Sequence, residues 1–250
     1  MMKSLSTAVG AAVFGFCSAV AMADGHAPHW SYHGHEGPEN WGKIAAEFAT
    51  CSAGKNQSPV DLSGVAEADL KSIEFNYKDG PLKLVNNGHT VQVNVAPGST
   101  ITVNGHAYQL AQFHFHSPSE HTVEAKSFPL EAHFVHKDKD GNLAVVGVLF
   151  KEGAENAALA PIWANLPTEQ GKEKSEEGVS VSAKALLPEN PEYYRYSGSL
   201  TTPPCSEGVT WLVMTEPLEV SRAQVEKFRS LMGGDTNRPV QPLNARLPIK

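Results

Sequence analysis

The 250-residue chain has little of three things: cysteine, positive charge and long hydrophobic runs. Its 20 lysine and arginine residues are outnumbered by 27 aspartate and glutamate residues, which gives a formal net charge of −7. A protein that binds nucleic acid needs cationic side chains to neutralise phosphates, so this balance argues against a nucleic-acid partner. The chain also lacks the clustered lysine and arginine residues that attract membrane surfaces.

The one extended apolar stretch lies at the amino terminus. Lys3 precedes a mostly apolar or small run over residues 5–20, and Ala21-Met22-Ala23 has the A-x-A pattern of a signal-peptide cleavage site. The run is short and interrupted by serine and glycine, which disfavours a membrane span. We therefore predict a cleaved signal peptide over residues 1–23 and a single exported domain over residues 24–250, with no membrane span after processing.

Cysteine is scarce, with three residues in all. Cys17 lies inside the predicted signal peptide, so Cys51 and Cys205 remain in the exported protein. An even count in an oxidising compartment favours a disulfide bond, with two buried free thiols as the alternative. A bond between them would close a loop of about 155 residues and stabilise the fold by roughly 5 kcal/mol, an upper figure from chain entropy.

Short alternating segments separated by turn dipeptides fill the first half of the chain. Asp79-Gly80, Asn87-Gly88, Pro97-Gly98 and Asn104-Gly105 mark turns, and the segments between them alternate as strands do. Many strands and few helices indicate a β-dominated domain, although these patterns leave sandwich, barrel and open sheet undecided. Beyond these segments we predict a buried strand over residues 143–150, helices over 156–165 and 223–231, and a solvated loop over 167–179.

Two histidine-bearing stretches have the period of a strand. His114 and His116 are two residues apart and therefore share one face, while the phenylalanines beside them take the other. If residues 131–136 pair antiparallel with that strand, His133 lies beside the first two. Three imidazoles meeting at one point suit Zn²⁺ with an open fourth position. A single strand histidine is more often a hydrogen-bonded core residue, and the H-x-H pair alone is a weak signal.

These stretches belong to a longer set of motifs that resembles the α-class carbonic anhydrases, zinc enzymes that interconvert CO₂ and bicarbonate. The similarity covers nearly the whole chain after the predicted signal peptide, and the motifs occur in the family's order. After the second histidine the chain has Ser117-Pro118, where animal members commonly have Trp-Gly. The motifs are HWSYHGHEGPENW (residues 29–41), NQSPV (56–60), NNGH (86–89), QFHFHSPSEHTV (112–123), EAHFVH (131–136), SLTTPP (199–204) and QPLNAR (241–246).

The resemblance implies a mainly β fold, with a single domain around a large, twisted, mostly antiparallel sheet and a few short peripheral helices. It also implies one Zn²⁺ per chain, held by His114, His116 and His133. Metal-bound histidines pass their other ring N–H to an acceptor, which sets the tautomer. The family's pattern assigns as acceptors Gln112 to His114, Glu131 to His133 and the Asn244 backbone carbonyl to His116.

Further roles carry over from the family's mechanism. Thr201 resembles the threonine that orients the zinc-bound hydroxide, and Glu120 resembles the carboxylate that accepts its hydrogen bond. His89 resembles the proton shuttle, a role that suits an imidazole because its pKa lies near neutrality. Substrate contacts are assigned to Thr202, Val135, Val145, Leu200, Val209 and Trp211, the ordering of cavity water to Tyr32, Asn87 and Gln92, and structural roles to His106, His121 and His136, with His121 and Tyr196 in one buried network.

The leading expectation is reversible, zinc-dependent hydration of CO₂ by a carbonic anhydrase (carbonate dehydratase, a lyase) in a bacterial periplasm, with secretion and a homodimer left open. An inactive carbonic-anhydrase-like binding protein is the alternative, but such proteins usually lack a zinc histidine and all three are present. A zinc hydrolase on another β architecture is the third, and the motifs around Glu120 and Thr201 do not predict it. After cleavage, Asp24-Gly25-His26 could also wrap Cu²⁺ or Ni²⁺, although a tail without a metal role is the simpler interpretation.

Overall fold

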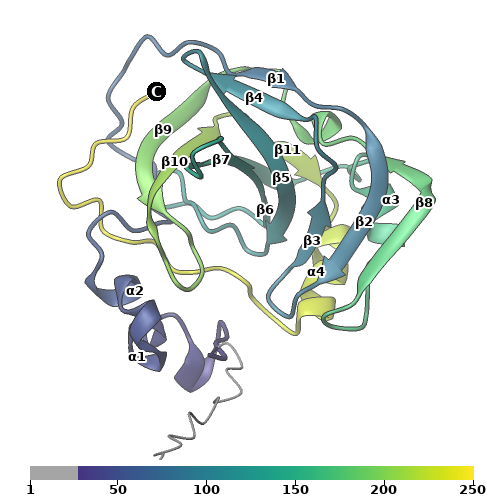
Figure 1. Ribbon diagram of the computed structural model, residues 1–250, viewed down its shortest axis with the longest axis horizontal. Helices are drawn as coiled ribbons and strands as arrows, with labels where there is room; N and C mark the ends of the chain where they lie inside the picture. The colour runs from purple at the N-terminus through teal and green to yellow at the C-terminus, as the bar shows by residue number, and fades with distance from the viewer. Residues whose placement is uncertain (1–27) are drawn as a thin grey trace, which may run out of the picture.

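The computed structural model describes residues 28–250. The predicted signal peptide, its cleavage site and the Asp24-Gly25-His26 start lie outside the described residues. Within them the chain forms an eleven-stranded sheet with short helices around it (Figure 1). The strands are β1 Glu74–Asn76, β2 Gly80–Asn86, β3 Val91–Asn94, β4 Thr100–Val103, β5 His106–His116, β6 Leu130–Lys137, β7 Leu143–Glu152, β8 Glu173–Val181, β9 Tyr193–Ser199, β10 Glu207–Met214 and β11 Leu218–Val220, and the α-helices are α1 Trp41–Ile44, α2 Thr50–Ala53, α3 Ala160–Ala164 and α4 Arg222–Met232.

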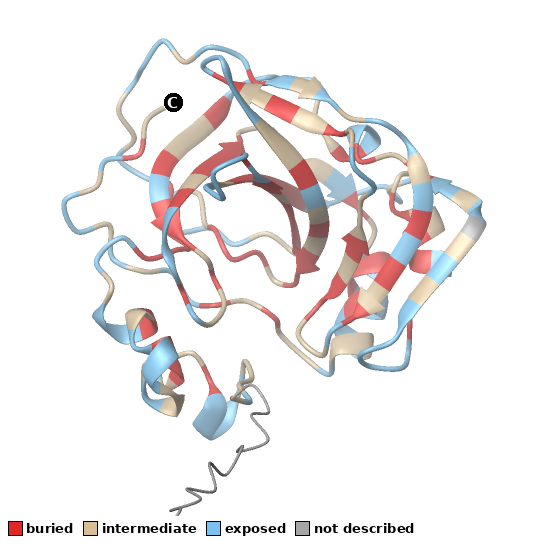
Figure 2. Cartoon of the chain, viewed as in Figure 1, coloured by how far each residue is buried: buried red, intermediate tan, exposed pale blue. Residues whose placement is uncertain are grey.

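The sheet has the strand order β8-β2-β3-β5-β6-β7-β10-β9, with β4 beside β5, β1 beside β4 and β11 beside β7. Neighbouring strands run antiparallel, except that β10 and β11 are parallel to β7. The prediction of a mainly β fold around a mostly antiparallel sheet is therefore confirmed. Strands β5, β6, β7, β10 and β9 curve around the middle of the molecule (Figure 1), and buried residues gather on them (Figure 2).

The two predicted helices form to different extents. The one predicted over residues 223–231 is α4, which begins with a capping box between Ser221 and Gln224. The one predicted over residues 156–165 is confined to α3, which begins only at Ala160 and has Pro161 in its first turn. Proline is tolerated there because the first-turn N–H groups have no intrahelical acceptor in any case.

The prediction of a loop over residues 167–179 is wrong for the second half of that range. Residues 173–181 form β8, which pairs with β2 at the outer edge of the sheet and is largely exposed (Figure 2). Charged side chains suit an edge strand, because they discourage its unpaired backbone groups from pairing with another chain. The same charges made the segment look like a loop in the sequence.

Side chains along β5 and β6 point alternately to the two faces of the sheet, so the core residues and the predicted zinc ligands lie on opposite faces. Phe113, Phe115 and Phe134 are fully buried on one face, where they pack in the main hydrophobic cluster with Trp163 of α3 and Phe228 of α4. Full burial of such a side chain contributes about 1.5–3 kcal/mol. The other face of the same strands carries the three predicted zinc ligands. The phenylalanines thus hold the strands in place, and the histidines need not contribute to the core.

The amino-terminal helices form a smaller cluster of their own. Trp41 of α1 and Cys51 of α2 pack there together with Phe48 and Cys205. Cys51 and Cys205 are joined by a disulfide bond, as predicted. Because Cys205 lies in the loop between β9 and β10, the bond ties the amino-terminal helices to that loop. Among residues 28–250 the helices are all too short or too polar to cross a membrane.

His136 lies on β6 but faces away from the predicted zinc ligands, as expected. It is fully buried, with Nε2 2.7 Å from the Tyr77 hydroxyl and Nδ1 3.2 Å from the Ala144 carbonyl oxygen. Burial lowers the pKa of His136 to about 4, against the opposing effect of its backbone hydrogen bonds. In the unfolded chain the pKa is about 6.5, so between these values the unfolded state binds more protons and stability falls as the pH falls.

We therefore expect a His136→Gln variant to lose less stability on acidification than the wild type. Glutamine can donate to the Ala144 carbonyl and accept from Tyr77, but it does not titrate. Between pH 7 and pH 4 the wild type is expected to lose up to about 3 kcal/mol more than the variant. Urea unfolding of both proteins across this pH range measures the difference. Parallel stability curves for the two proteins would show that the protonation of His136 is not linked to unfolding.

Candidate metal centre

The register of β5 and β6 brings the three predicted ligands together. His114 lies directly opposite His133, and His116 follows two residues along β5 on the same face. One ring nitrogen from each of the three histidines lies within 4.8 Å of one from each of the others. This is the convergence that the spacing of the histidines predicts when the two strands pair antiparallel.

The second ring nitrogen of each histidine has an oxygen partner. His114 Nδ1 donates to Gln112 Oε1 at 2.8 Å, and His133 Nε2 donates to Glu131 Oε1 at 2.9 Å. His116 Nδ1 donates to a backbone carbonyl at 2.6 Å. Because each of these nitrogens carries the ring proton, the remaining nitrogen of each ring presents a lone pair. The inward-facing atoms are therefore Nε2 of His114 and His116 and Nδ1 of His133.

The carbonyl that holds His116 belongs to Thr236, so the prediction of Asn244 for this role is wrong. Thr236 is fixed opposite His116 by two hydrogen bonds with Ser117, one from its own N–H and one to its hydroxyl. The Asn244 side chain instead donates to the Lys55 carbonyl at 2.7 Å. A backbone carbonyl can come from any residue, so the contact depends on chain geometry rather than on a residue type.

The protonation states of the three rings suit a metal ion. Burial lowers the pKa of all three histidines, to about 4 for His116 and well below its usual value for His114. They are therefore neutral at pH 7, as metal ligands must be. His116 Nε2 is buried and finds no hydrogen-bond partner among residues 28–250. An unpartnered buried nitrogen beside two others fits Zn²⁺, which commonly takes three histidines and keeps a fourth position open.

A second cluster, formed by His121, Glu131 and His133, is saturated by its own hydrogen bonds. Glu131 Oε1 accepts from His121 Nδ1 at 2.7 Å as well as from His133, and His121 Nε2 lies 2.6 Å from the Tyr196 hydroxyl. Although burial raises it, the two histidines hold the pKa of Glu131 well below its usual value. The cluster therefore acts as a buried support for His133.

Glu120 lies beside two of the predicted ligands, His116 and His133, and is itself buried. Its Oε1 accepts from the Arg238 backbone N–H at 2.8 Å, and its Oε2 lies 3.7 Å from His116 Nε2 and 3.8 Å from His133 Nδ1. Burial raises the pKa of Glu120 to about 7, while His133, Arg238 and the nearby Thr201 hydroxyl act to lower it. A cation at the three histidines would favour the ionised form further.

The predicted shuttle and water-ordering residues line one cavity together with His114 and His116, two of the three predicted ligands. The His89 ring stacks on Trp30, with the ring centroids 3.6 Å apart and the planes 8° from parallel. Burial, together with the nearby His29, lowers the pKa of His89 to about 4. The Tyr32 hydroxyl is buried without a hydrogen-bond partner among residues 28–250. The lining residues are Trp30, Tyr32, Asn87, His89, Thr90, Gln92, Gln112, His114, His116 and Thr202.

The five apolar residues among those assigned to substrate contacts lie in a single hydrophobic cluster. Val145, Val209 and Trp211 are buried within it, and Val135 and Leu200 pack against it partly exposed. The Trp211 ring centroid is 4.8 Å from that of His133, so the cluster extends to one of the predicted ligands. The register explains the grouping, because Val135 and Trp211 both lie opposite Val145 on the neighbouring strands.

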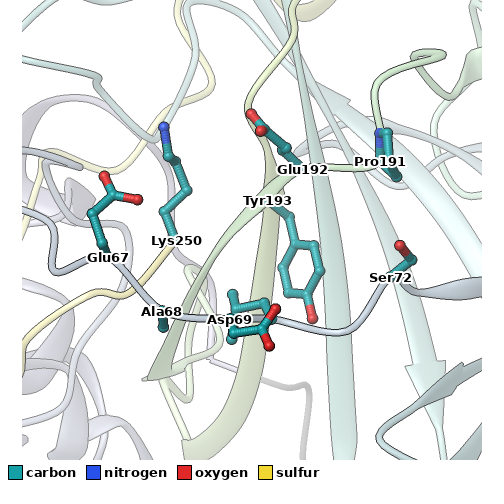
Figure 3. A pocket seen from close by; sticks show the side chains of 9 residues that line it. Glu67, Ala68, Asp69, Ser72, Pro191, Glu192, Tyr193 and Lys250 are labelled. Carbon is teal, nitrogen blue, oxygen red and sulfur yellow. The ribbon is translucent and has the colours of Figure 1, made fainter.

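Another hollow lies where the segment before β1 meets the start of β9 and the carboxy terminus (Figure 3). Glu67, Asp69, Glu192 and Lys250 surround it, and the Tyr193 hydroxyl donates to a nearby backbone carbonyl. It shares no lining residue with the cavity at His114 and His116. None of its acidic residues belongs to a metal-type cluster among residues 28–250.

A curved β-sheet thus presents three neutral histidines, able to hold a metal ion, beside a buried carboxylate. Residues 36–247 match the model of the eukaryotic-type carbonic anhydrases. A carbonic anhydrase from Neisseria gonorrhoeae is 48% identical over 231 residues, which cover 92% of this chain and 91% of that protein. The chain therefore belongs to the α-class, or eukaryotic-type, carbonic anhydrase family, and it is an enzyme of that class.

Solved structures agree with this assignment. A hyperthermostable carbonic anhydrase from an active hydrothermal vent chimney superposes with a TM-score of 0.86 at 59% identity, covering 88% of this chain and 99% of that one. The α-carbonic anhydrase of Thermovibrio ammonificans, solved with the inhibitor sulfanilamide, gives a TM-score of 0.87 at 51% identity, covering 90% of this chain and all of that one. The disulfide bond also fits an exported protein.

Proposed function

We propose that the protein catalyses the zinc-dependent, reversible hydration of CO₂ to bicarbonate and a proton. The observation that carries the proposal is the convergence of three neutral histidine nitrogens, each with its ring proton held by an oxygen on the far side. Membership of the carbonic anhydrase family supports the same reaction. The disulfide bond and the sequence of residues 1–23 support an exported, periplasmic location.

His114, His116 and His133 would hold the ion. Bound there, Zn²⁺ would lower the pKa of a water molecule to about 7, a figure for which carbonic anhydrase is itself the standard example. Neutral ligands leave the full charge of the ion available for this effect. The acceptors behind the rings keep the imidazoles in the tautomer and orientation that coordination needs, which typically affects metal affinity or activity by about 10–100-fold.

Thr201 and Glu120 would orient the attacking oxygen. An ionised carboxylate can only accept hydrogen bonds, so Glu120 compels the Thr201 hydroxyl to donate to it. The threonine oxygen is then left as an acceptor toward the cavity and selects a reacting oxygen that still carries a hydrogen. The burial of both residues supports this role, because a preorganised hydrogen bond in a dry site is worth more than one in water.

CO₂ has no dipole and is best held by an apolar surface. The cluster formed by Val135, Val145, Leu200, Val209 and Trp211 would supply that surface beside the ligands. Thr202 would contact the substrate or bicarbonate from the polar side of the cavity. This arrangement brings the carbon of CO₂ to the oxygen that Thr201 orients, which lowers the barrier by proximity.

His89 would carry the proton from the cavity to solvent through water ordered by Tyr32, Asn87 and Gln92. Its position in the same cavity as two of the ligands supports this role. While stacked on Trp30 the ring has a pKa of about 4, so it accepts a proton less readily than a free imidazole. Movement of the ring off Trp30 into water would return its pKa toward about 6.5 and favour transfer.

A His89→Ala variant is expected to lose at least about tenfold of its turnover in weak buffer, because proton removal then lacks its acceptor. Added imidazole should restore the rate, and the kcat/KM for CO₂ should stay near the wild-type value. Stopped-flow hydration across a buffer series measures all three. His35→Ala, which changes an exposed histidine just before α1, is the matched control. If His89→Ala turned over as fast as the wild type at low buffer concentration, His89 would not be the proton shuttle.

A further inference from the structure

Arg238 is a buried cation that the proposed reaction does not use. It is 1% exposed, and its guanidinium lies over the Trp41 ring, 5.6 Å from the centroid. One terminal nitrogen donates to Gln57 Oε1 and to the Ser58 carbonyl, each at 2.8 Å, and the other donates to the Cys51 carbonyl at 2.8 Å. Buried hydrogen bonds from a charged donor are among the strong ones in proteins. The side chain is therefore fixed at three points.

The backbone of the same residue reaches the site. The Arg238 N–H donates to Glu120 Oε1 at 2.8 Å, which leaves Oε2 facing His116 and His133 without a hydrogen-bond partner of its own among residues 28–250. The Thr201 hydroxyl lies beside the same carboxyl group. We propose that Arg238 is a positioning residue for CO₂ hydration: its anchored side chain pins the backbone that aims Glu120 at Thr201. The inference rests on the proposed function, because Glu120 and Thr201 have their roles only in that reaction.

The Arg238 side chain is also connected to the loop that carries Thr201. Gln57, which accepts from Arg238, donates through Nε2 to the Cys205 carbonyl at 3.0 Å. The Cys205 N–H in turn donates to the Thr202 carbonyl at 2.9 Å, within the loop that carries Thr201. Arg238 also donates to the Cys51 carbonyl, and Cys51 is joined to Cys205 by the disulfide bond, so a second connection runs from Arg238 to the same loop. The Arg238 guanidinium is thus connected through hydrogen bonds to the loop that carries Thr201.

The contacts that hold the predicted zinc ligands do not involve the Arg238 side chain. The carbonyl that holds His116 belongs to Thr236, which has its own two hydrogen bonds with Ser117. Loss of the Arg238 side chain should therefore leave the metal ligands in place and disturb Glu120. The expected signature is a loss of catalysis without a loss of zinc.

Replacement of Arg238 will also destabilise the fold, because Gln57, Ser58 and Cys51 then keep unpaired buried oxygens. Stability alone cannot separate the two effects. A double-mutant cycle with Thr201 separates them, since Thr201→Ala already removes the hydrogen bond that Glu120 serves. If Arg238 acts only through Glu120 and Thr201, its replacement should not lower kcat/KM further in the Thr201→Ala background. General damage to the site would lower kcat/KM in both backgrounds.

The experiment compares Arg238→Met in the wild-type and Thr201→Ala backgrounds, using mature protein loaded with zinc. We expect kcat/KM for CO₂ hydration to fall about tenfold in the first background and by less than about twofold in the second. Zinc content should stay near one per chain in every variant, and the melting temperature should fall equally in both backgrounds. Arg238→Lys keeps the charge and one or two of the contacts, so it gives the same pattern with a smaller loss if the methionine variant does not fold.

Arg246→Met is the matched control. The Arg246 guanidinium also binds backbone carbonyls and lies over an aromatic ring, that of Tyr196. Among residues 28–250, however, the backbone N–H that donates to Glu120 belongs to Arg238 and not to Arg246. The Arg246→Met variant should lose melting temperature and keep kcat/KM. An equal loss of kcat/KM in the two Thr201 backgrounds, or an unchanged kcat/KM for both Arg238 variants, would overturn the inference. Wild-type hydration reports on the proposed function separately, so an active wild type with either result refutes only the role of Arg238.

Discussion

A His116→Ala variant is expected to lose more than about a thousandfold in kcat/KM for CO₂ hydration, because two nitrogens no longer hold the ion that activates water. His116 is the most enclosed of the three ligands, with its ring proton held at 2.6 Å by the Thr236 carbonyl and its Nε2 buried. Alanine offers no nitrogen in place of the His116 imidazole. Stopped-flow hydration and metal analysis of the same sample measure activity and zinc content together.

His136→Gln is the matched control for this loss. His136 lies on β6 three residues after His133 and is equally buried, but it faces the hydrophobic core. We expect this variant to keep about one zinc per chain and near wild-type hydration at pH 7. If His116→Ala also kept its zinc and its activity, the ion would be bound elsewhere and the assignment of the three ligands would be wrong.

A Glu120→Gln variant is expected to lose about a hundredfold in kcat/KM while it keeps its zinc. Glutamine has nearly the shape of glutamate and can accept from the Arg238 N–H. Its amide also donates, however, so it no longer compels the Thr201 hydroxyl to point toward it. The reacting oxygen then loses its fixed acceptor. Hydration kinetics with zinc analysis distinguish this loss of orientation from a loss of metal.

Thr201 provides the controls for the orientation argument. Thr201→Ser keeps the hydroxyl and should retain most of the activity, whereas Thr201→Val removes it and should lose about as much as Glu120→Gln. Because both changes break one hydrogen bond, combining Thr201→Val with Glu120→Gln should cost little more than either alone. A Glu120→Gln enzyme with wild-type kcat/KM would show that the carboxylate does not orient the reaction.

The convergence of the three histidines could be predicted from the sequence because strand geometry determines which side chains share a face and lie opposite one another. Two histidines separated by one residue share a face, and the antiparallel pairing of β5 with β6 brings His133 opposite His114. The side-chain acceptors Gln112 and Glu131 follow from the same rule. The Thr236 carbonyl does not, because every residue has a carbonyl and the contact joins positions 120 residues apart. Its signal appears only when the chain is folded.

Other parts of the site depended on the family resemblance or escaped prediction. Val145, Val209 and Trp211 are ordinary strand residues in the sequence, and only their register with one another gathers them beside His133. Arg238 lies in a stretch of mixed polarity near the carboxy terminus, and nothing in its neighbours indicates a buried guanidinium. A long-range network of this kind has no local pattern, because its partners come from separate elements of the fold.

The most direct test of the central claim is CO₂ hydration by the mature protein, with its zinc content determined on the same sample. We predict about one zinc per chain, bound with the three-histidine geometry, and rapid hydration that disappears when a chelator removes the metal and returns when zinc is restored. Stoichiometric zinc without hydration would contradict the proposed reaction and leave a metal-binding member of the family. Protein that takes up no zinc would contradict the metal centre itself.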